Sequence, residues 1–129
     1  SACMKQVIRT PDAPGAVGAY SQGTTDGNIV FTAGQIPVTP EGEHLDGESI
    51  AVQTRQCLEN LKAVIEEEGL SMQSVLKITV YLDDIDDFES MDEAYAEYFQ
   101  DNPPARSAIG VDALPKDAAI EIEAVATTR

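Results

Sequence analysis

The 129-residue chain has no tryptophan, one histidine and two cysteines. The single histidine, His44, excludes a zinc site built on several histidines, and it excludes a Ser-His-Asp triad centred on any other residue. Two cysteines cannot form a disulfide framework, and they favour a reducing, cytoplasmic location. No apolar run approaches the roughly 20 residues of a membrane-spanning helix, so the sequence predicts that this is not a membrane protein.

Basic residues are also scarce, because Lys and Arg total 8 against 23 Asp and Glu, for a net charge of −15. Such a surface repels phosphate backbones and anionic lipids, which disfavours nucleic acids and membranes as partners. A small anionic substrate can bind only where an arginine or several backbone N–H groups converge. The acid excess, with few lysines, is typical of halophilic proteins that stay soluble in high salt.

The length fits one domain, and the 43% of hydrophobic residues suffices for a core. Three residues precede Met4, which we expect to be the native start. We therefore expect residues 4–129 to form a single domain and residues 1–3 to be a remnant of cloning. The chain begins with no charged-then-apolar leader, so we expect no secretion signal.

Hydrophobic periodicity predicts two helices, over 49–68 and 87–100. Ser49 is expected to cap the first helix and Gly69 to follow its end. Strands are predicted over 5–9, 19–25, 28–35, 75–82, 106–112 and 119–127, with a hairpin turn at Asp26-Gly27. In the fourth strand, alternation places Leu76 on the apolar face and Val75 on the opposite one.

The element order β-β-β-α-β-α-β-β predicts an α+β two-layer domain, with a mixed sheet and two helices packed on one of its faces. The other face would be bare in a monomer. Because Val75, Tyr81 and Val125 are expected to point to that bare face, we expect partner subunits to cover it in a closed oligomer.

Arg106, at the start of a strand, is the first candidate for chemistry. It can form a structural ion pair, or it can present its planar fork to a carboxylate ligand. Glu121 and Glu123 share one face of the last strand. They can form a solvated face, or one can meet Arg106 on the neighbouring strand and orient or deprotonate a water molecule.

The other candidates all have a structural interpretation, and Gly34 has a functional one as well. Tyr20 can be a half-buried residue at a strand start, and Gly34 can be a bulge or can let backbone N–H groups approach a ligand. Cys57 lies on an apolar helix face and is interpreted as core. The nine acids between Asp83 and Asp101 lack the spacing of a calcium loop, so we predict a solvated face and no metal site.

Several motifs resemble the RidA family of reactive intermediate deaminases, the YjgF-type proteins, along nearly the whole chain from Met4. They are Gly18-Ala-Tyr-Ser-Gln-Gly23, Thr32-Ala-Gly-Gln-Ile-Pro37, the helix with Gln53 and Asn60-Leu61, Pro104-Ala-Arg-Ser107 and Ile120-Glu-Ile-Glu-Ala124. The resemblance implies a chorismate-mutase-like fold, a homotrimer with three clefts between subunits, and no metal or cofactor.

The resemblance further implies hydrolysis of 2-imino acids, such as 2-iminobutanoate and 2-iminopropanoate, to 2-oxo acids and ammonia. Arg106 would clamp the substrate carboxylate, Glu121 would position the attacking water and move its proton, and Tyr20 would close the pocket. The backbone N–H of Gly34 and the backbone carbonyl of Ala108 would add hydrogen bonds.

Three positions depart from the family pattern. Ala108 stands where many members have cysteine, and Ala33 where serine is frequent. Asp92 stands where asparagine is frequent, and its extra charge is expected to weaken the binding of an anionic substrate. Two other functions remain open: a small-ligand-binding or chaperone-like trimer without catalysis, and a ribonuclease, which the net charge disfavours.

Overall fold

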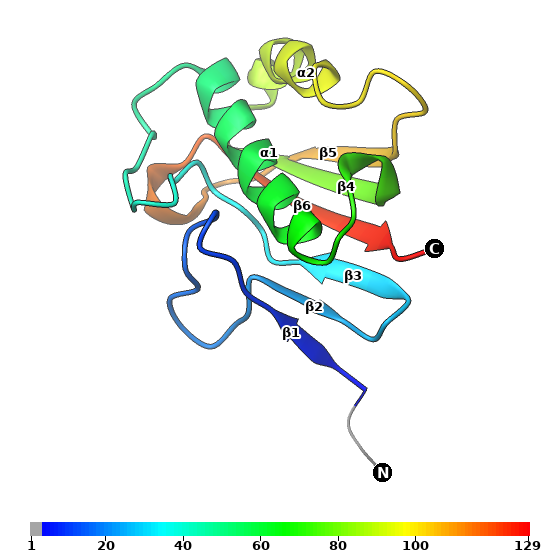
Figure 1. The fold of residues 1–129 in the computed structure, drawn as a ribbon. Helices are drawn as coiled ribbons and strands as arrows, with labels where there is room; N and C mark the ends of the chain where they lie inside the picture. The colour runs from blue at the N-terminus through cyan, green and yellow to red at the C-terminus, as the bar shows by residue number, and fades with distance from the viewer. Residues whose placement is uncertain (1–3) are drawn as a thin grey trace.

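The computed structural model describes residues 4–129, so the expectation for residues 1–3 lies outside the described residues. Two helices, α1 (Ile50–Glu67) and α2 (Phe88–Ala96), pack on one face of a six-stranded sheet, with α1 crossing in front of the strands (Figure 1). The predicted α+β two-layer fold and its element order are confirmed. Among residues 4–129, no helix combines the length and apolar character needed to span a bilayer.

The sheet has the strand order β1-β2-β3-β6-β4-β5. Within the described residues, β4 and β5 are the one parallel pair, and the other neighbouring strands are antiparallel. The bounds are β1 Gln6–Ile8, β2 Gly23–Thr25, β3 Ile29–Thr32, β4 Val75–Leu82, β5 Ala105–Gly110 and β6 Ile120–Thr127. Short 3-10 turns occupy Met72–Ser74, Ile85–Asp87 and Pro115–Asp117. The predicted strands over 19–25 and 28–35 are therefore shorter than the sequence suggested.

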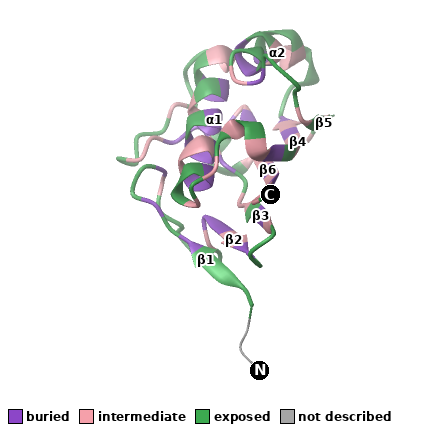
Figure 2. Cartoon of the chain, turned by 45° about the vertical axis from the view of Figure 1, so that its right-hand side comes forward, coloured by how far each residue is buried: buried purple, intermediate pink, exposed green. Residues whose placement is uncertain are grey.

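Helix α1 has the expected ends. The Ser49 side chain accepts a hydrogen bond from the Val52 N–H, and Gly69 adopts a φ of 74° just past the helix. The second helix is shorter than predicted, because beyond Ala96 the chain tightens into i→i+3 hydrogen bonds from Tyr98 to Tyr95 and from Phe99 to Ala96. Both helices carry buried and exposed segments, as amphipathic helices do (Figure 2).

The start of β4 corrects one prediction. Val75 is buried and belongs to the core, whereas Leu76 is 49% exposed, the reverse of what strict alternation predicted. The cause is a register shift, since Val75 pairs with Ala126 and Lys77 with Val125, which leaves Leu76 without a partner on β6. A β-bulge of this kind reverses the facing of the residues on one side of it.

From Lys77 onward the alternation holds. Ile78, Val80 and Leu82 are fully buried beneath the helices. On the opposite face Tyr81 and Val125 are partly exposed, and Phe31, which pairs with Val125, is 53% exposed. No helix among residues 4–129 covers this face, and the expectation that a partner subunit covers it stays a prediction.

A buried amide on α1 fixes the approach to β6. Gln53 is 2% exposed, and its Nε2 donates to the carbonyls of Asp46, at 3.1 Å, and Glu48, at 2.9 Å. Its Oε1 accepts from the Ala119 N–H at 3.0 Å, immediately before β6 begins. One side chain thus ties the loop before α1 to the strand that carries Glu121.

We predict that Gln53→Ala lowers the free energy of unfolding by about 1–3 kcal/mol, because three backbone groups lose the partner that a buried side chain supplies. Urea unfolding followed by circular dichroism measures this loss. Gln100→Ala removes the same side chain from an exposed position and is the matched control. Equal stabilities of the two variants would show that the Gln53 hydrogen bonds contribute nothing net.

Candidate functional site

A cavity of about 830 Å³ is lined by three of the candidate residues, Tyr20, Gly34 and Glu121. Its walls come from the loop before β2, the segment after β3, and the start of β6. His44 and Lys116 also line it, and sequence reasoning assigned neither of them to a site. The one available signal for Lys116 was its place after Pro115 in a turn, where it takes a left-handed φ of 57°.

Gly34 is required because the Glu121 carboxylate lies against it. A Cβ built on Gly34 would overlap Oε2 of Glu121 and would lie 2.8 Å from its Cδ. The chain around Gly34 is fixed by two hydrogen bonds, from the Gln35 N–H to the Ile122 carbonyl (2.8 Å) and from the Ile122 N–H to the Gln35 carbonyl (3.1 Å). The lack of a side chain at Gly34 therefore leaves room for the Glu121 carboxylate, and the approach of the Gly34 N–H to a ligand stays a prediction.

Glu121 has an unusual electrostatic environment. Burial raises the pKa of its carboxyl above the ordinary value, and the negative charge of Glu123 raises it further. Glu123 itself accepts a hydrogen bond of 3.1 Å from the Tyr81 hydroxyl, whose own pKa is raised by burial and by Glu123. A carboxyl group whose pKa lies closer to neutrality exchanges a proton with water more readily in both directions, as a general acid–base group must.

Tyr20 is at the mouth of this cavity rather than at a strand start. It is 54% exposed, and β2 begins only at Gly23. The preceding Gly18 has a φ of 116°, which turns the chain so that the Val17 N–H donates to the Tyr20 hydroxyl at 3.4 Å. An exposed ring at a cavity mouth can cover a bound ligand.

Arg106 lies elsewhere, between β5 and α2. Its Nη1 donates to Oδ1 of Asp92 at 2.6 Å. Its guanidinium carbon lies 5.3 Å from the centroid of the Phe88 ring and 4.7 Å from that of Tyr95, distances typical of cation–π contacts. In the single chain, Arg106 thus forms the structural ion pair that was one of its two interpretations.

The alternative in which Glu121 or Glu123 meets Arg106 on a neighbouring strand does not hold within one chain. β4 lies between β5 and β6 in the sheet. Arg106 is in register with Ile78, which faces the helices, whereas Glu121 is in register with Tyr81 on the open face. Successive residues of a strand point to opposite faces, so the guanidinium and the carboxylate lie on opposite sides of the sheet.

The remaining candidates divide between the two regions. Ala108 is in register with Val80 and packs against the core, on the same side as Arg106 and Asp92. Ala33 lies next to Gly34, and its N–H donates to the Gln22 carbonyl at 2.8 Å. Within residues 4–129, no three metal-ligating side chains come together.

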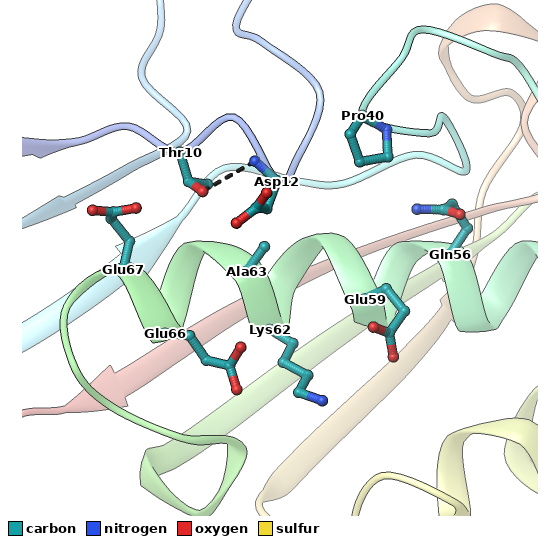
Figure 3. A pocket seen from close by; sticks show the side chains of 9 residues that line it. All are labelled: Thr10, Asp12, Pro40, Gln56, Glu59, Lys62, Ala63, Glu66 and Glu67. Carbon is teal, nitrogen blue, oxygen red and sulfur yellow. Dashed lines mark hydrogen bonds between the residues drawn. The ribbon is translucent and has the colours of Figure 1, made fainter.

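A second groove, of about 510 Å³, lies between α1 and the segment around Thr10 (Figure 3). Four acids line it, and Lys62 is its only basic residue among those described. The acids are Asp12, Glu59, Glu66 and Glu67. This concentration of negative charge repels an anionic substrate, so the cavity beside Glu121 is the better candidate site.

A family model described as Endoribonuclease L-PSP matches residues 10–128. A RutC family protein of Pyrococcus horikoshii is 54% identical over 124 residues, which cover 95% of this chain and 98% of the relative. An Escherichia coli relative named "Putative reactive intermediate deaminase TdcF" is 43% identical over 126 residues, covering 95% of this chain and 97% of the relative.

The fold also matches solved structures closely. The crystal structure of E. coli TdcF with bound serine superposes with a TM-score of 0.92 at 43% identity, covering 96% of this chain and 99% of the other. The E. coli YjgF gene product gives the same TM-score of 0.92, identity of 43% and coverage of 96% and 99%. The sequence comparison and the structure comparison therefore identify the same set of related proteins.

We predict that the pKa of Glu121 exceeds that of an ordinary glutamate and that Glu123→Gln lowers it, because the substitution removes the neighbouring negative charge. A pH titration of the side-chain carboxyl carbon by NMR measures both values. Glu89→Gln removes the same charge from an exposed position on α2 and is expected to change the Glu121 pKa far less. A Glu121 pKa at or below the ordinary value would contradict this account.

Proposed function

Because this chain belongs to the Endoribonuclease L-PSP family, which contains the YjgF/RidA proteins, we propose that it is a deaminase that hydrolyses reactive 2-imino acids to 2-oxo acids and ammonia. The observation that carries the proposal is the Glu121 carboxylate, which lies against Gly34 in a cavity and has a raised pKa.

The reaction asks little of the protein, because an imine carbon is already electrophilic. Glu121 takes a proton from a water molecule as the water oxygen bonds to that carbon and the C=N electrons move to nitrogen. Glu121 passes that proton to the nitrogen, which gives the carbinolamine. It then takes the proton of the carbinolamine hydroxyl as the C=O bond forms and delivers it to the nitrogen as the C–N bond breaks. The products are ammonia and the 2-oxo acid. Holding the water oxygen close to the imine carbon, in the geometry for bond formation, supplies much of the remaining rate acceleration.

The substrate carboxylate needs a cation, and Arg106 is the proposed clamp. Since Arg106 and Glu121 lie on opposite faces of one sheet, the proposal includes a homotrimer in which each cleft takes Glu121 from one copy and Arg106 of the partner subunit. Three features support this assembly: the open sheet face with its exposed Phe31, the edge position of β5, and the exposed Ile109 on that edge strand.

In the same cleft Tyr20 covers the ligand, while the Gly34 N–H and the Ala108 carbonyl supply hydrogen bonds. The proposed substrates are 2-iminobutanoate and 2-iminopropanoate, which escape from pyridoxal-phosphate enzymes such as threonine dehydratase. The crystal structure of E. coli TdcF has serine bound, which is a small amino acid of comparable size. The free thiol of buried Cys57 is in keeping with a reducing cytoplasm as the proposed location.

Two other functions compete with this proposal. The family description names an endoribonuclease, but a net charge of −15 opposes the approach of a phosphate backbone. A trimer that binds small ligands without catalysis would use the same cavity, and release of ammonia distinguishes it from a deaminase.

We predict that Arg106→Ala and Glu121→Gln each nearly abolish ammonia release from freshly generated 2-iminobutanoate. A charge-assisted bidentate contact is worth on the order of 2–4 kcal/mol, so Arg106→Ala should lower kcat/KM by about 30- to 1,000-fold. The measurement is a coupled assay in which threonine dehydratase supplies the imine and the protein is added in varying amounts.

Arg55→Ala is the matched control, because Arg55 also pairs with a carboxylate, that of Glu97, on the exposed side of the helices. It is expected to keep full activity. No acceleration by the unmodified protein would favour the non-catalytic binder, and cleavage of RNA confined to high salt would favour the ribonuclease.

A further inference from the structure

Arg55 and Arg106, the two arginines that pair with acids among the described residues, use different edges of the guanidinium. Nε and Nη2 of Arg55 donate hydrogen bonds to the two carboxylate oxygens of Glu97, at 3.0 and 2.8 Å. This is the bidentate geometry that suits a carboxylate. Arg106 contacts Asp92 through Nη1 alone, at 2.6 Å. Among residues 4–129, the Nε–Nη2 edge of Arg106 makes no such pair, so the edge that Arg55 uses remains free in Arg106.

The rest of the Arg106 side chain is held in place. Its side chain is only 23% exposed, against 45% for Arg55, and the rings of Phe88 and Tyr95 lie beside its guanidinium carbon. Asp92 comes from the same helix as both rings, one turn from each. Three α2 residues therefore fix one guanidinium, and the only directional contact among them is the one from Asp92.

The Tyr95 hydroxyl adds an independent sign that a ligand belongs here. It is buried, and among the described residues it has no hydrogen-bond partner of good geometry. Burial raises the pKa of Tyr95 to about 12. Arg106 opposes the shift through its charge and through a side-chain interaction with the hydroxyl that falls short of good hydrogen-bond geometry, and Asp92 adds to the shift, so the hydroxyl lies near both groups. Buried polar atoms are nearly always paired, and a ligand oxygen or a water molecule beside Arg106 would supply the missing partner.

We propose that Asp92 is a positioning residue, which holds Nη1 of Arg106 and thereby presents the free Nε–Nη2 edge to the carboxylate of a ligand. The identity of that ligand as an imino acid rests on the proposed function, but the positioning role does not. Fixing the fork before the ligand arrives reduces the ordering that binding requires.

This role changes what the sequence suggested about Asp92, which was only that its charge repels an anionic substrate. Substitutions at Asp92 distinguish its repulsion of an anionic ligand from its positioning of Arg106. Asp92→Asn removes the charge and keeps an oxygen that accepts from Nη1, whereas Asp92→Ala removes both. The two variants have the same net charge, so any difference between them reports on the acceptor and not on repulsion.

The test is isothermal titration calorimetry with 2-oxobutanoate, a stable carboxylate that requires no turnover. Asp92→Asn should bind it at least as tightly as the unmodified protein. Asp92→Ala should bind it about 10-fold more weakly than Asp92→Asn, the effect expected from losing one charge-assisted hydrogen bond. Glu93→Gln and Glu93→Ala, at the neighbouring exposed position, should give equal affinities.

Equal affinities of Asp92→Ala and Asp92→Asn, including no detectable binding by either, would overturn the proposal. Thermal unfolding of both variants verifies that each is folded, and an Arg106→Ala background should abolish the difference between them. Calorimetry measures binding without catalysis, so the comparison of Asp92→Ala with Asp92→Asn can still be interpreted if the protein shows no deaminase activity. Equal affinities of the two variants would in turn leave the deaminase proposal unaffected.

Discussion

The register of β4 against its two neighbours is the constraint on which the site depends. β5 pairs with β4 in parallel and places Arg106 beside Ile78, on the helix-covered side. β6 pairs with β4 in the opposite direction and places Glu121 beside Tyr81, on the open side. Moving Arg106 or Glu121 to the other face of the sheet would require a one-residue shift in strand register, which would also move the buried side chains of that strand to solvent. A single copy of the chain therefore keeps the guanidinium and the carboxylate on opposite faces.

In both regions the candidate site residue, Glu121 or Arg106, has an acidic neighbour. Glu123 raises the pKa of Glu121, and Asp92 binds one nitrogen of Arg106. The acids of this chain are therefore not all on solvated surface. Glu123 raises the pKa of Glu121, and Asp92 is the residue proposed to orient Arg106. Hydrogen bonds keep these acids in place, from Tyr81 to Glu123 and from Arg106 to Asp92.

Local pattern was enough to predict the elements, the α+β class and the ends of α1, since caps and periodicity are properties of neighbouring residues. It placed Val75 and Leu76 on the wrong faces, because a bulge depends on how β4 pairs with β6. It also made the strands of Arg106 and Glu121 neighbours, because no local signal shows that β4 inserts between them. The contact of Asp92 with Arg106 likewise depends on how α2 packs on the edge strand.

The central claim is that a complete site needs two copies of the chain, and subunit mixing tests it most directly. Arg106→Ala and Glu121→Gln chains are each expected to be inactive alone. If each cleft joins Arg106 from one copy to Glu121 from another, co-refolding equal amounts should restore about a quarter of the normal sites, because that fraction of random pairs unites two intact residues. Mixed assemblies that form but release no more ammonia than either parent would contradict the account.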